Sequence, residues 1–325
     1  MKILLTHTPE MRANYYGDRA LSGLRSLAQI QLHDQEDAMS PSELIVAAID
    51  ADAIIADRLT TGPADIFASL PNLKAFVRCA VDIRNIDVSA ASSVGVLVTH
   101  ACPGFVESVA ELTLGYLVDL ARGISRATAD YRTGHPPTAQ MGRQLSGSTI
   151  GIIGYGSIGQ YLASISTALG MHVLVSDPHA VVADPRFEQV TLDTLLTNAD
   201  HVVCLAVATD ATENLMNAAA FTMMKRDAVL INVSRGNLVD ETALTNALRD
   251  GTIAGAAMDV GRAVDQMPTP ALAARMDVIA TPHIGGLTPP AIEAQALDTV
   301  EQIKELAAGQ VPHGSVNADR WTRRF

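Results

Sequence analysis

The chain has few cysteines, a deficit of basic residues and no long apolar run. Its three cysteines, Cys79, Cys102 and Cys204, have neither metal-site nor disulfide spacing, so we predict a protein of a reducing compartment without a bound metal. Lysine and arginine number 23 against 35 acidic residues. The resulting net charge of −12 disfavours nucleic acid as a partner, because phosphate binding needs a basic surface.

The absence of a long hydrophobic run excludes a second class of proteins. No apolar segment approaches the length of a membrane span, and Ile3-Leu4-Leu5 is too short for the core of a signal peptide. A hydrophobic content of 48% with 18% charged residues is typical of a soluble globular protein. The 325 residues suit two domains. We therefore expect a cytoplasmic two-domain protein that binds no membrane.

The most informative segment is a glycine motif that follows a predicted strand. An apolar run ending at Ile153 leads into Gly154-x-Gly156-x-x-Gly159, and a helical pattern follows. The first glycine permits a tight turn, the second lets backbone approach a pyrophosphate, and the third lets the helix pack close to the strand. The amino terminus of the helix adds unpaired N–H groups and a positive dipole end. This order of elements predicts a dinucleotide site.

An acidic residue after the next strand indicates which dinucleotide binds. Asp177 ends a strand pattern over 172–176, where a carboxylate can accept hydrogen bonds from both hydroxyls of an adenosine ribose. It would repel a 2′-phosphate, and the next three residues contain no arginine to hold one. We therefore predict NAD as the cofactor. The alternative, a solvated residue at a strand end, is weakened by the position of Asp177 at the ligand-binding end of a parallel strand.

Strand and helix patterns alternate along the chain in two series. The first series has strands at 3–5, 53–56, 73–77 and 95–99, with helices at 18–27 and 42–49. A long helix at 105–122 precedes the second series, with strands at 150–153, 172–176, 201–206, 228–232, 254–258 and 277–280. This alternation predicts an α/β protein with parallel sheets, and the second series matches a doubly wound nucleotide domain. A final helix is expected from 289 to about 308, followed by a basic, aromatic tail on the surface or at an interface.

Several motifs in a fixed order resemble the D-2-hydroxyacid dehydrogenase family. Besides the glycine motif, these are Val109-Ala110-Glu111-Leu112-Thr113, Asn232-Val233-Ser234-Arg235-Gly236, Ala257-Met258-Asp259-Val260 and Thr281-Pro282-His283-Ile284-Gly285-Gly286. The resemblance covers nearly the whole chain. It implies a Rossmann NAD domain at 100–286 and a smaller flavodoxin-like α/β substrate domain formed by 1–99 and 287–325. It also implies a homodimer supported by the helix at 105–122.

The same resemblance implies an activity and two catalytic side chains. The expected enzyme is an NAD-dependent oxidoreductase that interconverts a small D-2-hydroxy acid and its 2-oxo acid. Arg235, after a buried strand, is expected to hold the carboxylate of this small anionic substrate through two parallel hydrogen bonds. His283 is expected to exchange the hydroxyl proton, since imidazole titrates near neutrality. A surface arginine and a packed histidine are the alternatives, and the motif contexts weigh against them.

The coenzyme contacts that the resemblance implies extend beyond the glycines. Backbone at Ser157 and Ile158 is expected to contact the pyrophosphate, and Asp259 is expected to accept a hydrogen bond from the nicotinamide amide. An apolar segment at 206–208 is expected to form a wall of the coenzyme site. Further contacts are expected at four residues, Val207, Val233, Ser234 and Gly285.

The expected partner of the histidine departs from the family pattern. Family members usually carry a glutamate a few residues after the Asp-Val pair, and none occurs between Val260 and His283. Asp265 is the nearest substitute, with a side chain one methylene shorter. It either replaces the glutamate or is an exposed loop residue. The departure also keeps open the dehydrogenation of a different small anion, of the formate or phosphite type, and a non-catalytic NAD sensor.

The substrate loop departs as well. Where the family has Arg-x-Gly-x-Gly, the chain reads Arg78-Cys79-Ala80-Val81-Asp82. The backbone N–H groups of Ala80, Val81 and Asp82 remain available to bind the substrate carboxylate, but the glycine freedom to adopt positive φ is lost. An unusual or larger substrate is one explanation, and a structural brace between Asp82 and Arg84 is the other.

Overall fold

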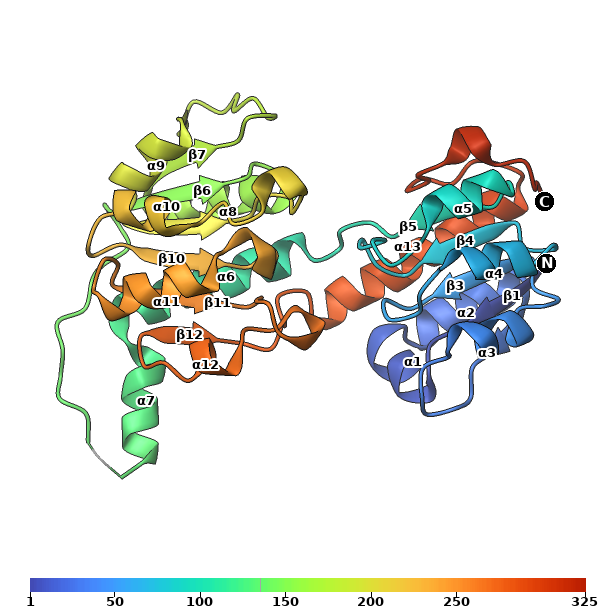
Figure 1. Ribbon diagram of the computed structural model, residues 1–325, viewed down its shortest axis with the longest axis horizontal. Coiled ribbons are helices and arrows are strands. Elements are labelled where there is room, and N and C mark those ends of the chain that lie inside the picture. The colour runs from blue at the N-terminus through green and yellow to red at the C-terminus, as the bar shows by residue number, and fades with distance from the viewer. Residues whose placement is uncertain (135) are drawn as a thin grey trace. The chain divides into compact units, whose positions relative to one another are not determined.

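The structure is a computed structural model. It describes every residue except His135, and of Asp265 it describes the backbone but not the side chain. The chain forms two compact units. The terminal unit consists of Met1–Phe105 and Thr288–Phe325, and the central unit is Val106–Leu287 (Figure 1). No helix in the described part of the chain has both the length and the apolar character needed to cross a membrane.

The terminal unit is built on a five-stranded sheet whose neighbouring strands are all parallel. Its strands are β1 Lys2–Leu5, β2 Gln29–Leu32, β3 Ala53–Ala56, β4 Ala75–Arg78 and β5 Leu97–His100. They lie in the order β2-β1-β3-β4-β5, which confirms the flavodoxin-like fold. The edge strand β2 was not predicted, because its two glutamines alternate with half-buried residues and leave no apolar run.

Helices cover both faces of this sheet because alternate strand residues point to opposite sides. Ile3, Leu5 and Ile55 pack in one core with Leu24 of α2 and Val300 of α13. A separate core on alternate residues of the same strands holds helices α3, α4 and α5. The helices are α1 Pro9–Tyr15, α2 Asp18–Leu27, α3 Pro41–Ala47, α4 Ala64–Ser69, α5 Val88–Ser93 and α13 Pro289–Ala307.

The carboxyl-terminal tail corrects one expectation. The tail was expected on the surface or at an interface, but Trp321 is buried in the core of the terminal unit. Its indole N–H donates to the backbone oxygens of Lys74 and Arg323, at 3.1 and 3.0 Å. The apolar ring and its satisfied donor make the tail part of the fold.

The central unit contains a seven-stranded parallel sheet. Its strands are β6 Thr149–Ile153, β7 His172–Ser176, β8 Phe187–Gln189, β9 His201–Cys204, β10 Val229–Asn232, β11 Gly255–Met258 and β12 Val278–Ala280. The order β12-β11-β10-β9-β6-β7-β8 confirms the doubly wound Rossmann fold, with the reversal of strand order between β6 and β9. The sequence pattern missed β8, because this short edge strand buries only Phe187.

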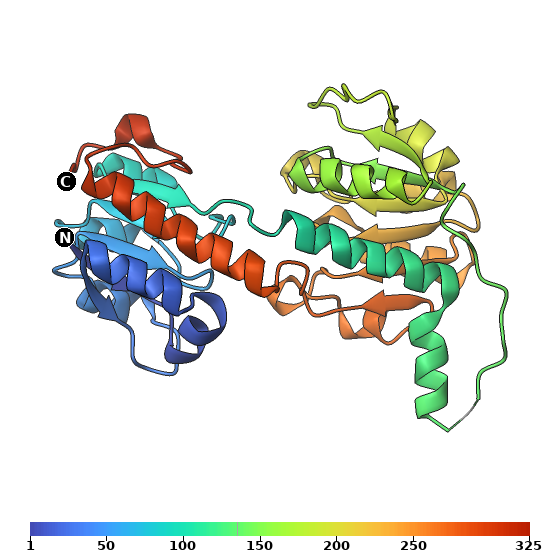
Figure 2. The same ribbon diagram turned by 180° about the vertical axis from the view of Figure 1, so that it is seen from behind.

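Helices flank the central sheet on both faces. Figure 2 shows α6 Val106–Arg122 and α8 Ser157–Ala168 side by side on one face. The other face packs Leu195, Phe221 and Leu244 from α9 Leu192–Asn198, α10 Ala218–Met223 and α11 Glu241–Arg249. The short α12 Pro270–Ala273 packs beside β12. Helix α7, Ile124–Arg132, projects from the unit and contains no buried residue.

Candidate functional site

The glycine loop joins β6 to α8 at the carboxyl edge of the central sheet. At Gly154 and Gly159 a side chain would clash with neighbouring backbone. Gly154 has a φ of +100°, and a Cβ there would lie 2.7 Å from the carbonyl oxygen of Leu205. A Cβ on Gly159 would lie 2.3 Å from the carbonyl oxygen of Gly154. These two glycines therefore shape the loop.

Gly156 differs from the other two because it faces open space. A Cβ on Gly156 would meet no atom of the described residues within 4 Å, so the loop leaves open space on this side. Gly156 is also the N-cap of α8, and none of the side chains that the structure describes caps that end of the helix. The amides of Ser157 and Ile158 lie in this first turn, where backbone N–H groups and the helix dipole favour an anion. The loop fits a pyrophosphate.

Asp177 lies at the carboxyl end of β7, on the same edge as the glycine loop. Its carboxylate accepts hydrogen bonds from the backbone N–H groups of Tyr155, His179 and Ala180, at 2.7, 2.8 and 3.1 Å. Desolvation alone would raise the pKa of Asp177, but these donors outweigh it and the pKa lies below its ordinary value. The charged side chain is thus held in place. Two carboxylate oxygens offer about four acceptor positions, so it retains capacity for ribose hydroxyls.

The turn after β10 carries Arg235 and is shaped by a buried amide. The Asn232 side chain accepts from the N–H of Ser234 at 3.1 Å and donates to the carbonyl of Arg235 at 2.9 Å. The Ser234 hydroxyl donates to the carbonyl of Ala206 at 2.7 Å, which ties this turn to the segment after β9. A Cβ on Gly236 would lie 2.0 Å from the carbonyl oxygen of Gly261, so two backbone loops meet there. Asn232 belongs to one of the motifs that resemble the family, but its role in shaping this turn is not evident from the sequence.

Arg235 and the neighbouring expected coenzyme contacts lie at this edge. The Arg235 side chain is half-buried, and its Nη1 donates to the carbonyl of Ser234 at 2.7 Å. Val233 is buried, whereas Val207 has 77% of its surface exposed. An exposed valine beside the strand ends offers apolar surface that a flat ring could cover. Its role as a coenzyme wall stays a prediction.

His283 follows β12 in an unusual backbone conformation. Its φ is +56°, in the left-handed region that residues other than glycine rarely occupy. Its backbone N–H donates to the carbonyl oxygens of Asp259 and Thr281, both at 3.0 Å. The loop around it is therefore held from the end of β11.

Asp259 is the centre of that loop. Only 1% of its surface is exposed, and its two carboxylate oxygens accept from the N–H groups of Ile284 and Gly285, each at 2.8 Å. Gly285 has no Cβ, which would otherwise lie 2.9 Å from the carboxylate. The structure thus brings Asp259, His283 and Gly285 together. It gives Asp259 a role in holding the loop that the sequence did not indicate, and the expected contact with nicotinamide stays a prediction.

The expected partner of His283 falls outside what the structure describes. Asp265 lies in a short 3₁₀ turn, Val264–Gln266, after β11. Its side chain is outside the described residues. Whether it replaces the glutamate of the family stays a prediction.

The expected substrate loop lies in the terminal unit, directly after β4. Ala80, Val81 and Asp82 are not among the described residues with positive φ, so this loop uses ordinary backbone conformations. Arg84 donates to the Asp82 carboxylate from Nε at 3.0 Å and from Nη2 at 2.6 Å. The brace proposed for this pair is therefore present. The availability of the three backbone N–H groups to a substrate stays a prediction.

A buried guanidinium organises the same edge of the terminal unit. Arg78 donates to the carbonyl of Asp57, to that of Thr60 at 2.8 Å and to the side chain of Asn85 at 2.6 Å. Burial lowers the pKa of Arg78 to about 10, which leaves it charged near neutrality. Beside it, burial lowers the pKa of His7 to about 4. The carboxyl edge of the terminal sheet is therefore organised by buried side chains, Arg78 and His7 among them.

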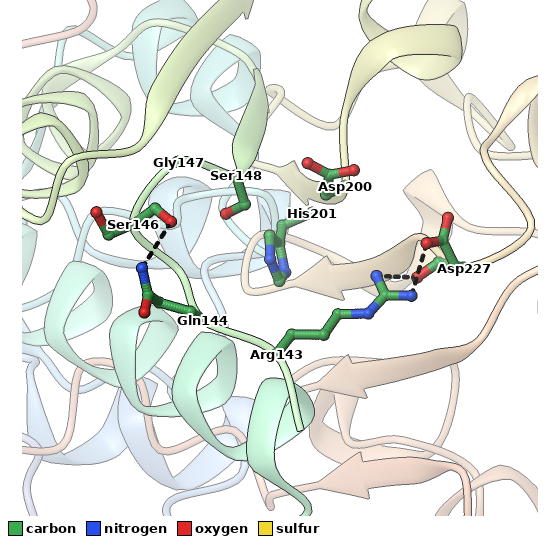
Figure 3. Close-up of a pocket in the computed structure, with 8 residues that line it drawn as sticks. All are labelled: Arg143, Gln144, Ser146, Gly147, Ser148, Asp200, His201 and Asp227. Atoms are coloured by element: carbon green, nitrogen blue, oxygen red, sulfur yellow. Dashed lines mark hydrogen bonds and ion pairs between the residues drawn. The ribbon is translucent and has the colours of Figure 1, made fainter. Parts of the chain in front are cut away.

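A hollow of the central unit lies away from these loops. Its volume is about 420 Å³. Figure 3 shows the residues that line it at the amino ends of β6 and β9, among them Arg143, His201 and Asp227. Arg143 pairs with Asp227 at 2.7 Å, and burial lowers the pKa of His201. The glycine loop follows the opposite end of β6, so this cavity is not the predicted coenzyme site. No cluster that could hold a metal ion occurs among the side chains that the structure describes.

Comparison with known proteins places these loops in a family. Residues 114–285 match the profile described as D-isomer specific 2-hydroxyacid dehydrogenase, NAD binding domain. This match confirms the prediction of an NAD-binding domain. The solved structure of D-lactate dehydrogenase with NAD⁺ from Lactobacillus jensenii superposes with a TM-score of 0.83 at 26% identity, covering 97% of this chain and 99% of that one.

Two relatives extend the similarity beyond that domain. D-3-phosphoglycerate dehydrogenase from Mycobacterium leprae is 33% identical over 288 residues, which cover 87% of this chain and 54% of the relative. The chain thus spans about half the length of that protein. Hydroxypyruvate reductase from Thermotoga maritima is 32% identical over 282 residues, covering 85% of this chain and 92% of the relative. By its family profile, its relatives and its fold, the chain belongs to the D-isomer specific 2-hydroxyacid dehydrogenases.

Proposed function

We propose that the chain is an enzyme that interconverts a small D-2-hydroxy acid and its 2-oxo acid, with NAD as the redox partner. The observation that carries this proposal is the common location of Arg235, His283 and the glycine loop. All three follow parallel strands of one sheet at its carboxyl edge. A cation for a carboxylate and an imidazole for a proton beside a dinucleotide loop are what such a reaction requires.

The coenzyme, when bound, supplies or accepts the hydride. Its pyrophosphate would lie against Gly156, Ser157 and Ile158, and Asp177 would accept from the ribose hydroxyls. Val207, Val233 and Ser234 would line the remainder of the site, with Asp259 and Gly285 near the nicotinamide. These assignments are supported by the exposed Val207, the fixed Asp177 carboxylate and the open space at Gly156.

Two side chains would act on the substrate. Arg235 would hold the carboxylate through paired hydrogen bonds and polarise the adjacent carbonyl. His283, in its protonated form, would donate a proton to the carbonyl oxygen during reduction and would accept it during oxidation. Backbone N–H groups of Ala80, Val81 and Asp82 would assist in binding the carboxylate. Asp265 would stabilise the protonated histidine.

The relatives suggest which acids to test. One is named for hydroxypyruvate and another for 3-phosphoglycerate. We propose a small 2-oxo acid as the substrate, and hydroxypyruvate, pyruvate, glyoxylate and the phosphorylated form of hydroxypyruvate as the first panel.

The test is NADH oxidation against this panel at several pH values. We expect turnover of at least one acid of the panel in the wild type, and almost complete loss of it in His283→Ala and Arg235→Ala. His172→Ala is the matched control, because His172 is an exposed histidine at the amino end of β7 in the same unit. Asp265→Ala tests whether this residue replaces the glutamate of the family, and turnover should fall in this variant if it does. NADH binding without turnover of any acid would support the sensor instead.

We further propose that the protein is a cytoplasmic homodimer. Helix α7 has no buried residue, and Ile124 and Tyr131 expose 51% and 66% of their surfaces. A second copy would cover this apolar surface. Free thiols at Cys79, Cys102 and Cys204 support a reducing compartment. Sedimentation of the wild type as a dimer and of Ile124→Glu as a monomer would support the assembly, and a monomeric wild type would contradict it.

A further inference from the structure

His283, the proposed acid–base residue, lies beside the end of a chain of hydrogen bonds, or relay, that begins on α6, a helix distant in the sequence. The hydroxyl of Thr281 donates to the Asp259 carboxylate at 2.5 Å, and the phenol of Tyr116, on α6, contacts the oxygen of Thr281. Asp259 in turn accepts from the N–H groups of Ile284 and Gly285, which flank His283 on its carboxyl side.

The direction of each hydrogen bond follows from the donor inventory. A carboxylate can only accept hydrogen bonds, so the single hydroxyl proton of Thr281 is donated to Asp259. The remaining lone pairs of Thr281 can then only accept, and Tyr116 is the donor. Burial raises the pKa of Tyr116, with Asp259 adding to the effect, so the phenol keeps its proton in ordinary buffers. The relay therefore runs one way, from Tyr116 through Thr281 to Asp259.

Helix α6 also limits the movement of the loop through packing. A Cβ on Gly285 would approach Asp259 at 2.9 Å and Val109 at 3.3 Å. Tyr116 is 4% exposed, which leaves its ring little room to move. The left-handed conformation of His283 is unfavourable for a residue with a Cβ, so it persists only where surrounding contacts impose it. Its backbone N–H donates to the carbonyl oxygens of Asp259 and Thr281, the two residues that the relay joins.

We infer that Tyr116 and Thr281 are positioning residues that act through Asp259 to hold His283 in its left-handed conformation. This inference rests on the acid–base role of His283 under the proposed function. Neither residue is assigned contact with substrate or coenzyme. Losing the Thr281 hydroxyl would leave Asp259 with fewer donors and would let the imidazole adopt other positions.

The test compares Thr281→Val, Thr281→Ser and Tyr116→Phe in the full chain. Valine keeps the shape of threonine without its hydroxyl, and misplacement of a reacting group by about 1 Å can cost about 100-fold in rate. We expect Thr281→Val to lower kcat by about 10- to 100-fold with little change in the KM for NADH. Tyr116→Phe should show a smaller loss, and Thr281→Ser should retain the wild-type kcat. Thr167→Val, which removes a helix-bound hydroxyl of α8, is the matched control.

Two readouts separate positioning from a general loss of structure. With NADH deuterated at the transferred position, the isotope effect on kcat should rise in Thr281→Val, because the chemical step becomes slower than product release. Without coenzyme, amide exchange in 281–286 should accelerate while the exchange of α8 stays unchanged. The double variant Tyr116→Phe/Thr281→Val should have the same kcat as Thr281→Val alone, since both residues act through the same hydrogen bonds.

The outcomes distinguish this inference from the proposed function. If the wild type turns over and His283→Ala does not, an unchanged kcat in Thr281→Val overturns the inference alone. A fall in kcat without a larger isotope effect, accompanied by faster exchange throughout the unit, overturns it as well. A wild type without turnover overturns the proposed function. The inference that Tyr116 and Thr281 position a catalytic histidine is overturned in that case as well. Amide exchange at 281–286 then reports only whether the relay holds the loop.

Discussion

The carboxyl edges of the two sheets are built from different parts of the chain. In the central unit, backbone forms the edge: Gly156 opens onto free space, and the first turn of α8 has no side-chain cap. In the terminal unit, buried side chains form it, with Arg78 and Asp57 at its centre, and Ala80, Val81 and Asp82 are not among the described residues with positive φ. Backbone N–H groups are present whatever the side chains are, so an edge built from them can bind the same anion in proteins of different sequence. An edge built from side chains can change its binding properties when those residues change.

The two edges should therefore respond differently to mutation. Changes at the edge of the terminal unit should affect folding, because its charged groups, Arg78 and Asp57, are buried and hydrogen-bonded. Changes at the edge of the central unit should divide into those that distort the loop and those that only obstruct a ligand.

The largest effect is expected from Arg78→Met in the terminal unit. The change leaves the buried carbonyls of Asp57 and Thr60 without their donor, and unsatisfied buried groups of this kind are costly. We expect the free energy of unfolding to fall by about 3 to 5 kcal/mol, measured by urea denaturation. A fall below about 1 kcal/mol would mean that the terminal edge is not organised by this guanidinium.

A pH dependence of stability should follow from His7 at the same edge. Its pKa is lowered from 6.5 to about 4 by burial, so the unfolded chain binds the proton more tightly than the folded one. Stability should therefore fall as the pH drops from 6.5 to about 4, by up to about 3 kcal/mol. Denaturation curves of wild type and His7→Leu, recorded across this range, measure the effect. An equal slope in both proteins would assign the dependence to other groups.

The glycine loop allows a matched pair of variants in the central unit. Gly159→Ala places a Cβ 2.3 Å from a carbonyl oxygen and should destabilise the protein by about 1 to 3 kcal/mol. Gly156→Ala meets nothing within 4 Å and should leave stability unchanged while weakening NADH binding by about tenfold. Thermal melting and fluorescence titration check the two effects. Similar NADH affinity in Gly156→Ala and the wild type would contradict the pyrophosphate assignment.

The smallest effect is expected from the Asp82–Arg84 brace. Both side chains are partly exposed, and exposed ion pairs contribute little. Arg84→Ala should change the free energy of unfolding by less than about 1 kcal/mol. A large change in the KM for a 2-oxo acid, at constant stability, would show that the pair orients the substrate loop and would narrow the contrast between the two edges.

Local chemistry explains why much of the fold could be predicted. The steric demands of Gly154 and Gly159 arise within one strand–turn–helix segment, so the motif is readable without the remainder of the chain. Long apolar strands such as β6 are also evident from sequence, because both of their faces are buried. The edge strands β2 and β8 were missed, since each buries too little to leave a pattern.

The two parallel sheets, the dinucleotide loop, the acid after β7 and the family could all be predicted, because each depends on residues close together along the chain. The groups that hold these residues in place became evident only from the packing of the folded chain. Tyr116 and Thr281 are 165 positions apart, and Trp321 reaches the carbonyl of Lys74 across 247. No periodicity records such partners, since a hydrogen bond depends on where packing brings two elements together, and only the folded chain specifies that.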